Sequence, residues 1–205
     1  MHEQAARMIR LVEDLLSLSR IELNEHVMPQ DRVALAPLLT YLADTLELRA
    51  GERGMRILLD LPPGLPDLLG DGDELAQVFQ NLVDNAIKYG RAGSEITVAA
   101  ATGARPASSG DLGESAFVSV AVRDHGEGIS REHLPRLTER FYRIDNARSR
   151  EMGGTGLGLA IVKHIVNRHR GFLEIDSTPG TGSVFTVFLR PHPAASPGPC
   201  SGGAA

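Results

Sequence analysis

A cluster of glycines precedes an apolar, helix-compatible run in the last third of the chain. Gly153, Gly154, Gly156 and Gly158 fall within six residues, and L-A-I-V-K-H follows. Glycine costs a helix about 1 kcal/mol relative to alanine, so this concentration needs a reason. One reason is a phosphate site, because glycine lets the backbone approach a ligand and a helix N-terminus attracts anions. A flexible loop before a core helix is the other, and the stretch alone leaves both open.

A second group of polar residues lies on one face of an expected helix. Asn81, Asn85 and Lys88 occur at spacings of four and three, within a segment whose apolar residues predict a helix from Glu74 to Tyr89. Asparagine is a poor core residue unless its amide is hydrogen-bonded. Two carboxamide oxygens and a lysine suit a hydrated Mg²⁺ and its phosphates, because Mg²⁺ prefers oxygen ligands. A solvated helix face is the alternative.

Two further segments contribute a carboxylate and a group of arginines. The sequence D-H-G-E-G-I begins at Asp124, directly after an apolar strand. This carboxylate can accept a hydrogen bond from an exocyclic amine beside a flat base, although a common Asx turn has the same sequence. Four arginines fall within eleven residues, namely Arg140, Arg143, Arg148 and Arg150. Arginine pairs well with phosphate oxygens, and a solvated basic loop is the alternative.

The elements that must position these groups alternate loosely between helix and strand. Periodicity predicts helices over 1–23, 35–53, 74–89, a short one near 131–137, and one from the glycines to about 170. It predicts strands over 55–61, 96–101, 116–122, 172–176 and 183–189. The last strands pair through short turns. This order indicates an α+β fold with one mixed sheet covered by helices.

Composition limits the classes of function. The chain has 205 residues, of which 42% are hydrophobic, and a net charge of −5. This acidic balance does not indicate a nucleic-acid-binding protein, which would carry excess positive charge. No apolar run approaches the roughly 18 residues of a membrane span. The single Cys200 can form no internal disulfide, so a reducing compartment is expected. The first helix has a broad apolar face, which needs a partner.

Four segments, in this order and spacing, resemble the motifs of one family. N-L-V-D-N-A-I-K-Y, D-H-G-E-G-I, R-F-Y-R-I-D and G-T-G-L-G-L-A-I-V-K resemble the N box, the first glycine box, the F box and the second glycine box of bacterial sensor histidine kinases. The resemblance spans about residues 30–190, and within the family the segments resemble those of phosphate-regulon-type sensor kinases. In the first helix, V-E-D-L-L-S-L-S-R-I-E resembles the end of the second helix of the family's dimerisation and phosphoacceptor domain.

The resemblance implies three parts for the chain. Residues 1–27 would be the C-terminal helix of a truncated dimerisation domain, 28–190 the ATP-binding catalytic domain, and 191–205 a disordered tail. The catalytic domain would be a two-layer α/β sandwich of the Bergerat type, with ATP and Mg²⁺ as its ligands.

The resemblance also implies roles for individual residues. Asn85 would ligate Mg²⁺ with Asn81 assisting, and Tyr89 would flank the nucleotide. Lys88 and Arg143 would be catalytic, the first meeting phosphate and the second reaching the γ-phosphate.

Asp124 would receive the adenine amine. The remaining residues implied for nucleotide binding shape the pocket or approach the phosphates: Gly126, Gly128, Ile129, Arg140, Gly154, Thr155, Gly156, Leu157 and Gly158. Residues 145–155 would form a mobile lid, with the positive end of the following helix behind it.

One departure from the family concerns the phosphoacceptor. The family's histidine lies in an S-H-E-L-R-T-P-like context, and nothing here matches it, because His2-Glu3 is followed by Gln4-Ala5-Ala6. We therefore expect the chain to bind Mg-ATP without autophosphorylating. The whole protein would transfer the γ-phosphoryl to its own histidine and then to a response regulator. A homodimer through the first helix and a cytoplasmic location are implied, with the full-length protein anchored in the bacterial inner membrane by segments outside this chain.

Two other functions fit parts of the sequence. One is a non-kinase ATPase or protein-serine kinase of the same ATP fold. A gyrase-like site would want a glutamate in the 74–89 helix to activate water, whereas Gln77, Gln80 and Asp84 flank the asparagines. The other is a non-catalytic fragment that joins intact kinase dimers through its apolar first helix.

Overall fold

The computed structural model describes residues 2–23, 26–104, 116–144 and 154–193. Its main sheet has five strands in the order β2-β4-β5-β7-β6. Their bounds are β2 Arg56–Asp60, β4 Glu95–Ala104, β5 Ala116–Asp124, β7 Gly182–Leu189 and β6 Phe172–Thr178. β2 runs parallel to β4, and every other neighbouring pair is antiparallel. The mixed sheet predicted from the sequence is therefore confirmed.

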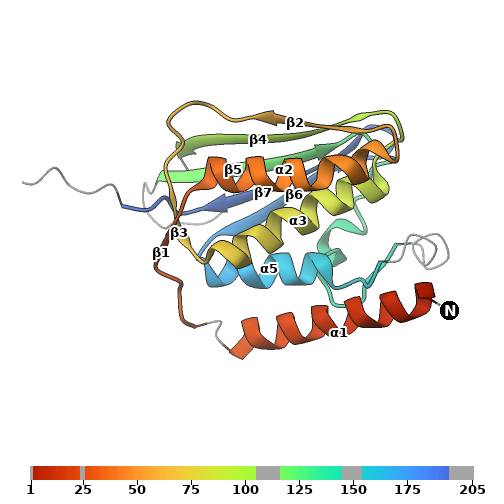
Figure 1. The fold of residues 1–205 in the computed structure, drawn as a ribbon, viewed down its shortest axis with the longest axis horizontal. Coiled ribbons are helices and arrows are strands. Elements are labelled where there is room, and N and C mark those ends of the chain that lie inside the picture. Colours follow the sequence, from red (N-terminus) through yellow and green to blue (C-terminus); the bar gives the residue numbers. More distant parts are fainter. Residues whose placement is uncertain (1, 24–25, 105–115, 145–153, 194–205) are drawn as a thin grey trace, which may run out of the picture.

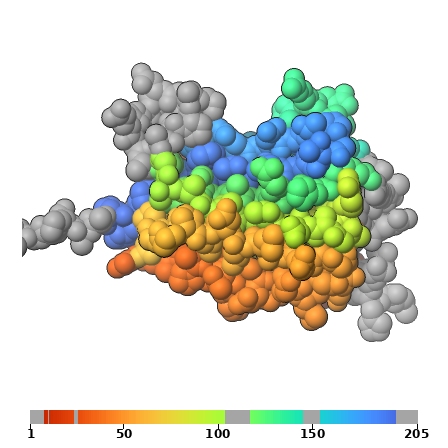
Figure 2. All heavy atoms as spheres, turned by 90° about the horizontal axis from the view of Figure 1, so that it is seen from above, coloured from red at the N-terminus to blue at the C-terminus, as the bar shows by residue number. Residues whose placement is uncertain are grey.

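Helices cover one face of this sheet. α2 (Leu35–Gly51), α3 (Gly72–Tyr89) and α5 (Gly158–Arg168) pack on it, and α1 (His2–Leu23) lies against α5 on the side away from the sheet (Figure 1). Figure 2 shows the opposite face, where the strands lie side by side from β2 in orange to the blue C-terminal strands. The core lies between the two layers and is mostly aliphatic, with Ile96 and Ile161 fully buried beside the aromatic Phe79. This is the two-layer α+β architecture that the sequence predicts.

The N-terminal end of α3 is fixed by a buried histidine. His169 has no exposed surface, and its Nδ1 donates to the Ile165 carbonyl (2.8 Å) while its Nε2 accepts from the Asp71 amide (3.0 Å). Burial lowers the pKa of His169, so the ring is neutral. Asp71 in turn caps α3, because its side chain accepts from two amides of the first turn. The hydrogen bonds of His169 and Asp71 therefore fix the position at which α3 begins.

The structure differs from the sequence prediction in short elements. β1 (Asp31–Val33) and β3 (Leu68–Gly70) form an unpredicted antiparallel pair. The short helix expected near 131–137 is only a 3-10 turn, Leu134–Arg136. Pro191, assigned to the tail, forms a β-bridge with Leu68, so ordered pairing extends past residue 190.

α1 is only partly covered by the rest of the described chain. Leu18 and Ile21 are buried, whereas Met8 and Leu23 are 68% and 81% exposed. The broad apolar face predicted from the sequence is thus present and largely open to solvent. Among the described helices, none is long and apolar enough to cross a membrane.

Some expectations concern segments outside the described residues. They are most of the expected lid (145–153, with Arg148 and Arg150) and the tail from 194 onward with Cys200.

Candidate functional site

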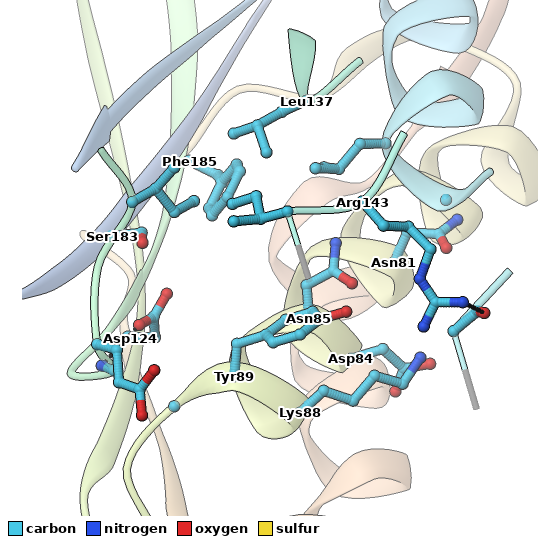
Figure 3. Close-up of a pocket in the computed structure, with 18 of the residues that line it drawn as sticks. Asn81, Asp84, Asn85, Lys88, Tyr89, Asp124, Leu137, Arg143, Ser183 and Phe185 are labelled. Atoms are coloured by element: carbon cyan, nitrogen blue, oxygen red, sulfur yellow. Dashed lines mark hydrogen bonds between the residues drawn. The ribbon is translucent and has the colours of Figure 1, made fainter. Parts of the chain in front are cut away.

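A cavity of about 750 Å³ lies between α3, the start of α5 and the ends of β5 and β7. All but two of the residues that the sequence analysis assigns to nucleotide or metal line it. Asp124 and Ser183 lie at one end of this cavity, Asn81 and Arg143 lie at the other, and Asn85 and Tyr89 lie between them (Figure 3). Segments far apart in the sequence therefore meet around one space.

The end formed by the sheet carries a buried carboxylate. Asp124 is the last residue of β5 and is 6% exposed, and its Oδ1 accepts from the Gly126 amide at 2.8 Å. The Asx turn considered from the sequence is thus present, in the wall of the cavity. Burial raises the pKa of Asp124, while hydrogen bonds from the Gly126 and Ser183 amides oppose that rise.

Glycine is required in this turn because other backbone passes very close. A Cβ on Gly126 would collide with the Tyr89 carbonyl oxygen. Gly128 has φ +69°, and a Cβ there would collide with the Thr178 carbonyl. The next residue, Ile129, donates its amide to the buried Ser177 hydroxyl at 2.8 Å. The turn is therefore packed tightly from several sides.

α3 forms the long wall of the cavity. Asn81, Asn85, Lys88 and Tyr89 all line it, as their helical spacing predicts. The Asn81 Nδ2 donates to the Gln77 carbonyl at 2.9 Å, which turns the Asn81 oxygen toward α5. A Cβ on residue 158, the first of α5, would lie 2.8 Å from that oxygen, so Gly158 makes room for it.

The end formed by α5 brings the arginine and glycine segments together. The Arg143 Nη1 donates to the Gly154 carbonyl at 2.9 Å, and the Phe141 amide donates to the Gly156 carbonyl at 2.9 Å. Phe141 has φ 62° and Gly156 has φ 76°, both in the left-handed region. Gly154 is less constrained, since a Cβ there would find no atom closer than 3.6 Å. α5 begins at this end, so the first amides of the helix, which have no intrahelical acceptor, lie beside the cavity.

α1 touches the same end. Asp14 lines the cavity, and its Oδ2 accepts from the Thr155 hydroxyl at 2.7 Å. The Ser17 hydroxyl donates to the Gln77 side chain at 3.0 Å. The site is thus formed by α1 as well as by the sheet and α3.

Two predicted site residues do not line the cavity. Arg140 instead forms an ion pair with Glu22 of α1, so its guanidinium is directed to that helix. Leu157 is fully buried, because its apolar side chain joins the core beneath α5.

The cavity also has lining residues that the sequence analysis did not identify. They are Asp14, Arg53, Leu137, Tyr142, Ser183 and Phe185, among others. Ser183 and Phe185 share a face of a predicted strand, so alternation could have indicated them. For Asp14 and Arg53 no local pattern exists, because their contacts depend on how distant helices pack.

The family description "Histidine kinase-, DNA gyrase B-, and HSP90-like ATPase" matches residues 70–193. This match covers more than half of the chain, and the chain belongs to this family. It includes every lining residue of the cavity except Asp14 of α1 and Arg53, which follows α2.

Individual relatives agree with this assignment. The chain is 41% identical to the phosphate regulon sensor protein PhoR of Pseudomonas aeruginosa, over 93% of this chain and 40% of that protein. It is 33% identical to the sensor histidine kinase WalK of Bacillus subtilis, over 91% of this chain and 29% of that protein. The chain therefore spans less than half the length of these curated relatives.

A solved structure supports the same conclusion. The full-length ShkA structure, described as a complex with AMPPNP, matches 93% of this chain and 37% of its own, with 26% identity and a TM-score of 0.74. The fold class and family expected from the sequence are confirmed. The chain carries an ATP-binding catalytic domain of the sensor histidine kinase type.

Proposed function

We propose that the cavity binds Mg-ATP and positions its γ-phosphoryl group for transfer to a histidine. The observation that carries this proposal is the different chemistry of the two cavity ends. The base end, formed by Asp124 to Ile129 with Ser183 and Phe185, offers one buried carboxylate in an otherwise tight wall. The phosphate end, formed by Asn81, Arg143 and residues 154–158, offers a guanidinium and a helix N-terminus.

At the base end, Asp124 accepts the exocyclic amine of adenine. A carboxylate is an acceptor only, so it favours a ring that carries an amino group. Gly126 and Gly128 keep the floor free of side chains, and Tyr89 and Ile129 flank the base. This arrangement supports adenine over a ring with a carbonyl at the same position.

The residues present fit a magnesium ion beside the phosphates. Asn81 and Asn85 supply neutral carboxamide oxygens, and the Asn81 oxygen is oriented toward the start of α5 by the bond of its Nδ2 to Gln77. Mg²⁺ prefers oxygen ligands and keeps several waters, so two such ligands and the phosphates are sufficient. When bound, the ion neutralises phosphate charge.

Transfer then depends on position and charge. Arg143 is held by its hydrogen bond to the Gly154 carbonyl. Its guanidinium is therefore oriented toward the γ-phosphate before the nucleotide binds. Lys88 adds a second cation from α3. Both cations stabilise the negative charge on the phosphoryl group in the transition state of transfer.

In the whole protein, the acceptor is a histidine on another segment, and a response regulator receives the phosphoryl group next. A chain of 205 residues that contains no match to the family's acceptor motif binds nucleotide without labelling itself. α1 belongs, in this proposal, to the dimerisation domain, because its exposed apolar side chains are available to a second copy.

The test is incubation with γ-labelled Mg-ATP after nucleotide binding has been measured in the same sample. Binding without an acid-labile label supports the proposal, whereas an acid-labile label would mean that an acceptor histidine is present. No binding by the folded chain would overturn the proposal.

The metal-binding role is tested with Asn85→Ala. We expect the Mg²⁺-dependent part of ATP affinity to fall by about tenfold or more, because a ligand of the ion is lost, while circular dichroism shows an intact fold. Asn167→Ala, an exposed asparagine of α5, is the matched control and should bind as the wild type does. Unchanged affinity in Asn85→Ala would remove this residue from the metal site.

A further inference from the structure

The last turn of α2 and the turn that follows the helix present two arginines to α3. Arg49 lies in α2 and Arg53 lies two residues after it, and both side chains contact α3. Arg49 pairs with Asp84 of α3 at 2.7 Å. Arg53 reaches the C-terminal end of α3, one turn further along. Neither arginine belongs to the four motif segments.

Arg53 binds carbonyl oxygens that the helix itself leaves without partners. Its Nη1 donates to the Ile87 carbonyl and to the Lys88 carbonyl (2.6 Å), and its Nη2 donates to the Gly90 carbonyl (3.3 Å). The last carbonyls of a helix have no intrahelical donor and carry partial negative charge. The planar guanidinium supplies several donors in a fixed arrangement, which a lysine cannot reproduce.

The segment that Arg53 holds also shapes the base end. The Tyr89 carbonyl lies directly against Gly126, where no Cβ would fit. On the other side, a Cβ on Gly90 would lie 2.7 Å from the Met55 side chain. The backbone of Arg53 also accepts from the Gly93 amide at 3.0 Å. A shift of this turn would therefore move the wall against which the Asp124 turn packs.

We propose that Arg53 is a positioning residue for nucleotide binding. By holding the last turn of α3, it places the Lys88 and Tyr89 side chains at the cavity and keeps the Tyr89 carbonyl against Gly126. Arg53 acts through these groups, although its side chain also lines the cavity. The proposal rests on the proposed function, since it concerns the same Mg-ATP site.

The variants Arg53→Lys and Arg53→Gln test this role. Lysine keeps the charge but loses the forked geometry, and glutamine keeps a donor without the charge. Arg56→Gln is the matched control, because Arg56 lies three residues away and forms an exposed ion pair with Glu95 on β4. The dissociation constants of ATP, ADP and adenosine are measured at a temperature where thermal unfolding shows every variant to be folded.

We expect both Arg53 variants to bind all three ligands about tenfold more weakly. The variants lose the hydrogen bonds of the Arg53 guanidinium to the end of α3, and this part of α3 forms a wall of the cavity that every ligand contacts. Amide hydrogen exchange should rise at residues 86–93 and stay unchanged at the start of α3. Arg56→Gln should match the wild type in both measurements.

Two results would overturn the inference while the proposed function stands. One is wild-type affinity in a folded Arg53→Lys variant. The other is a loss for ATP and ADP with unchanged adenosine affinity, because the wall formed by Tyr89 and Gly126 would then not depend on Arg53. A wild-type chain that is folded and binds none of the three ligands would overturn the proposed function, and the inference with it.

Discussion

The base end and the phosphate end of the cavity are built in different ways. At the base end, Gly126 and Gly128 lie so close to other backbone that no Cβ fits. At the phosphate end the contacts are less close: a Cβ on Gly156 or Gly158 would lie 3.0 or 2.8 Å from its nearest neighbour, and Gly154 would accept a Cβ without a close contact. The neighbouring Thr155 bonds to α1. One end is thus fixed by the packing of strand ends, whereas the other is formed by loop segments and a partly exposed helix.

The two ends therefore recognise a ligand by different interactions. A tight, preformed wall with one buried carboxylate selects a ligand by shape and hydrogen bonding, because displacing it costs packing energy. An end that offers charges can bind phosphates without a close fit. In the proposed binding mode, adenosine reports on the base end alone, and the difference between ATP and adenosine reports on the phosphate end.

The largest expected effect is a difference in the free energy of unfolding between one glycine substitution at each end of the cavity. Gly128→Ala should lower the free energy of unfolding by about 3 kcal/mol, since the new methyl group collides with the Thr178 carbonyl and the residue keeps a positive φ. Gly154→Ala should change it by less than about 0.5 kcal/mol. Denaturant unfolding of both variants measures this difference. Similar losses in the two variants would mean that the two ends are equally rigid.

The next effect concerns the buried carboxylate of the base end. In Asp124→Asn the side-chain oxygen still accepts from the Gly126 amide, so the turn should persist. Affinity should fall by about 1.5 to 3 kcal/mol for adenosine and ATP alike, because a charged acceptor is replaced by a neutral amide. Isothermal calorimetry measures both, and Asp176→Asn, an exposed aspartate of β6, is the control. A loss for ATP alone would place the adenine elsewhere.

The same carboxylate predicts a pH dependence. Burial raises the pKa of Asp124, so on acidification it takes up a proton at a higher pH than an ordinary aspartate. Its capacity as an acceptor then falls, and adenosine affinity in the wild type should fall with it. The Asp124→Asn variant should lack this component.

The sequence predicts the base end and α3 better than the contacts around them. The helix at 74–89 and its polar face follow from periodicity, and Asp124 follows from a strand that ends in a glycine turn. Three-residue strands such as β1 and β3 are too short to produce a periodic pattern. The position of Arg140 against Glu22 depends on a contact 118 residues apart in sequence, which no local pattern encodes.

The smallest expected effect lies at the phosphate end, where α1 contributes an acidic side chain. The Asp14 carboxylate lines the cavity and bonds to Thr155, whose hydroxyl oxygen also accepts from the Leu157 amide at 3.3 Å. A carboxylate there occupies the positive start of α5 that phosphates would use. α1 and the nucleotide should therefore oppose each other at this end only.

Asp14→Asn tests that opposition. We expect ATP affinity to rise by about 0.5 kcal/mol at low salt, because a like charge near the phosphates is removed, and adenosine affinity to stay unchanged. Glu13→Gln, an exposed neighbour on α1, is the control for net charge. The gain should shrink at high salt, since partly exposed charges are screened. A fall in ATP affinity would instead mean that Asp14 supports the phosphate end, by fixing Thr155 or by contributing an oxygen to the ion. α1 would then favour nucleotide binding and not oppose it.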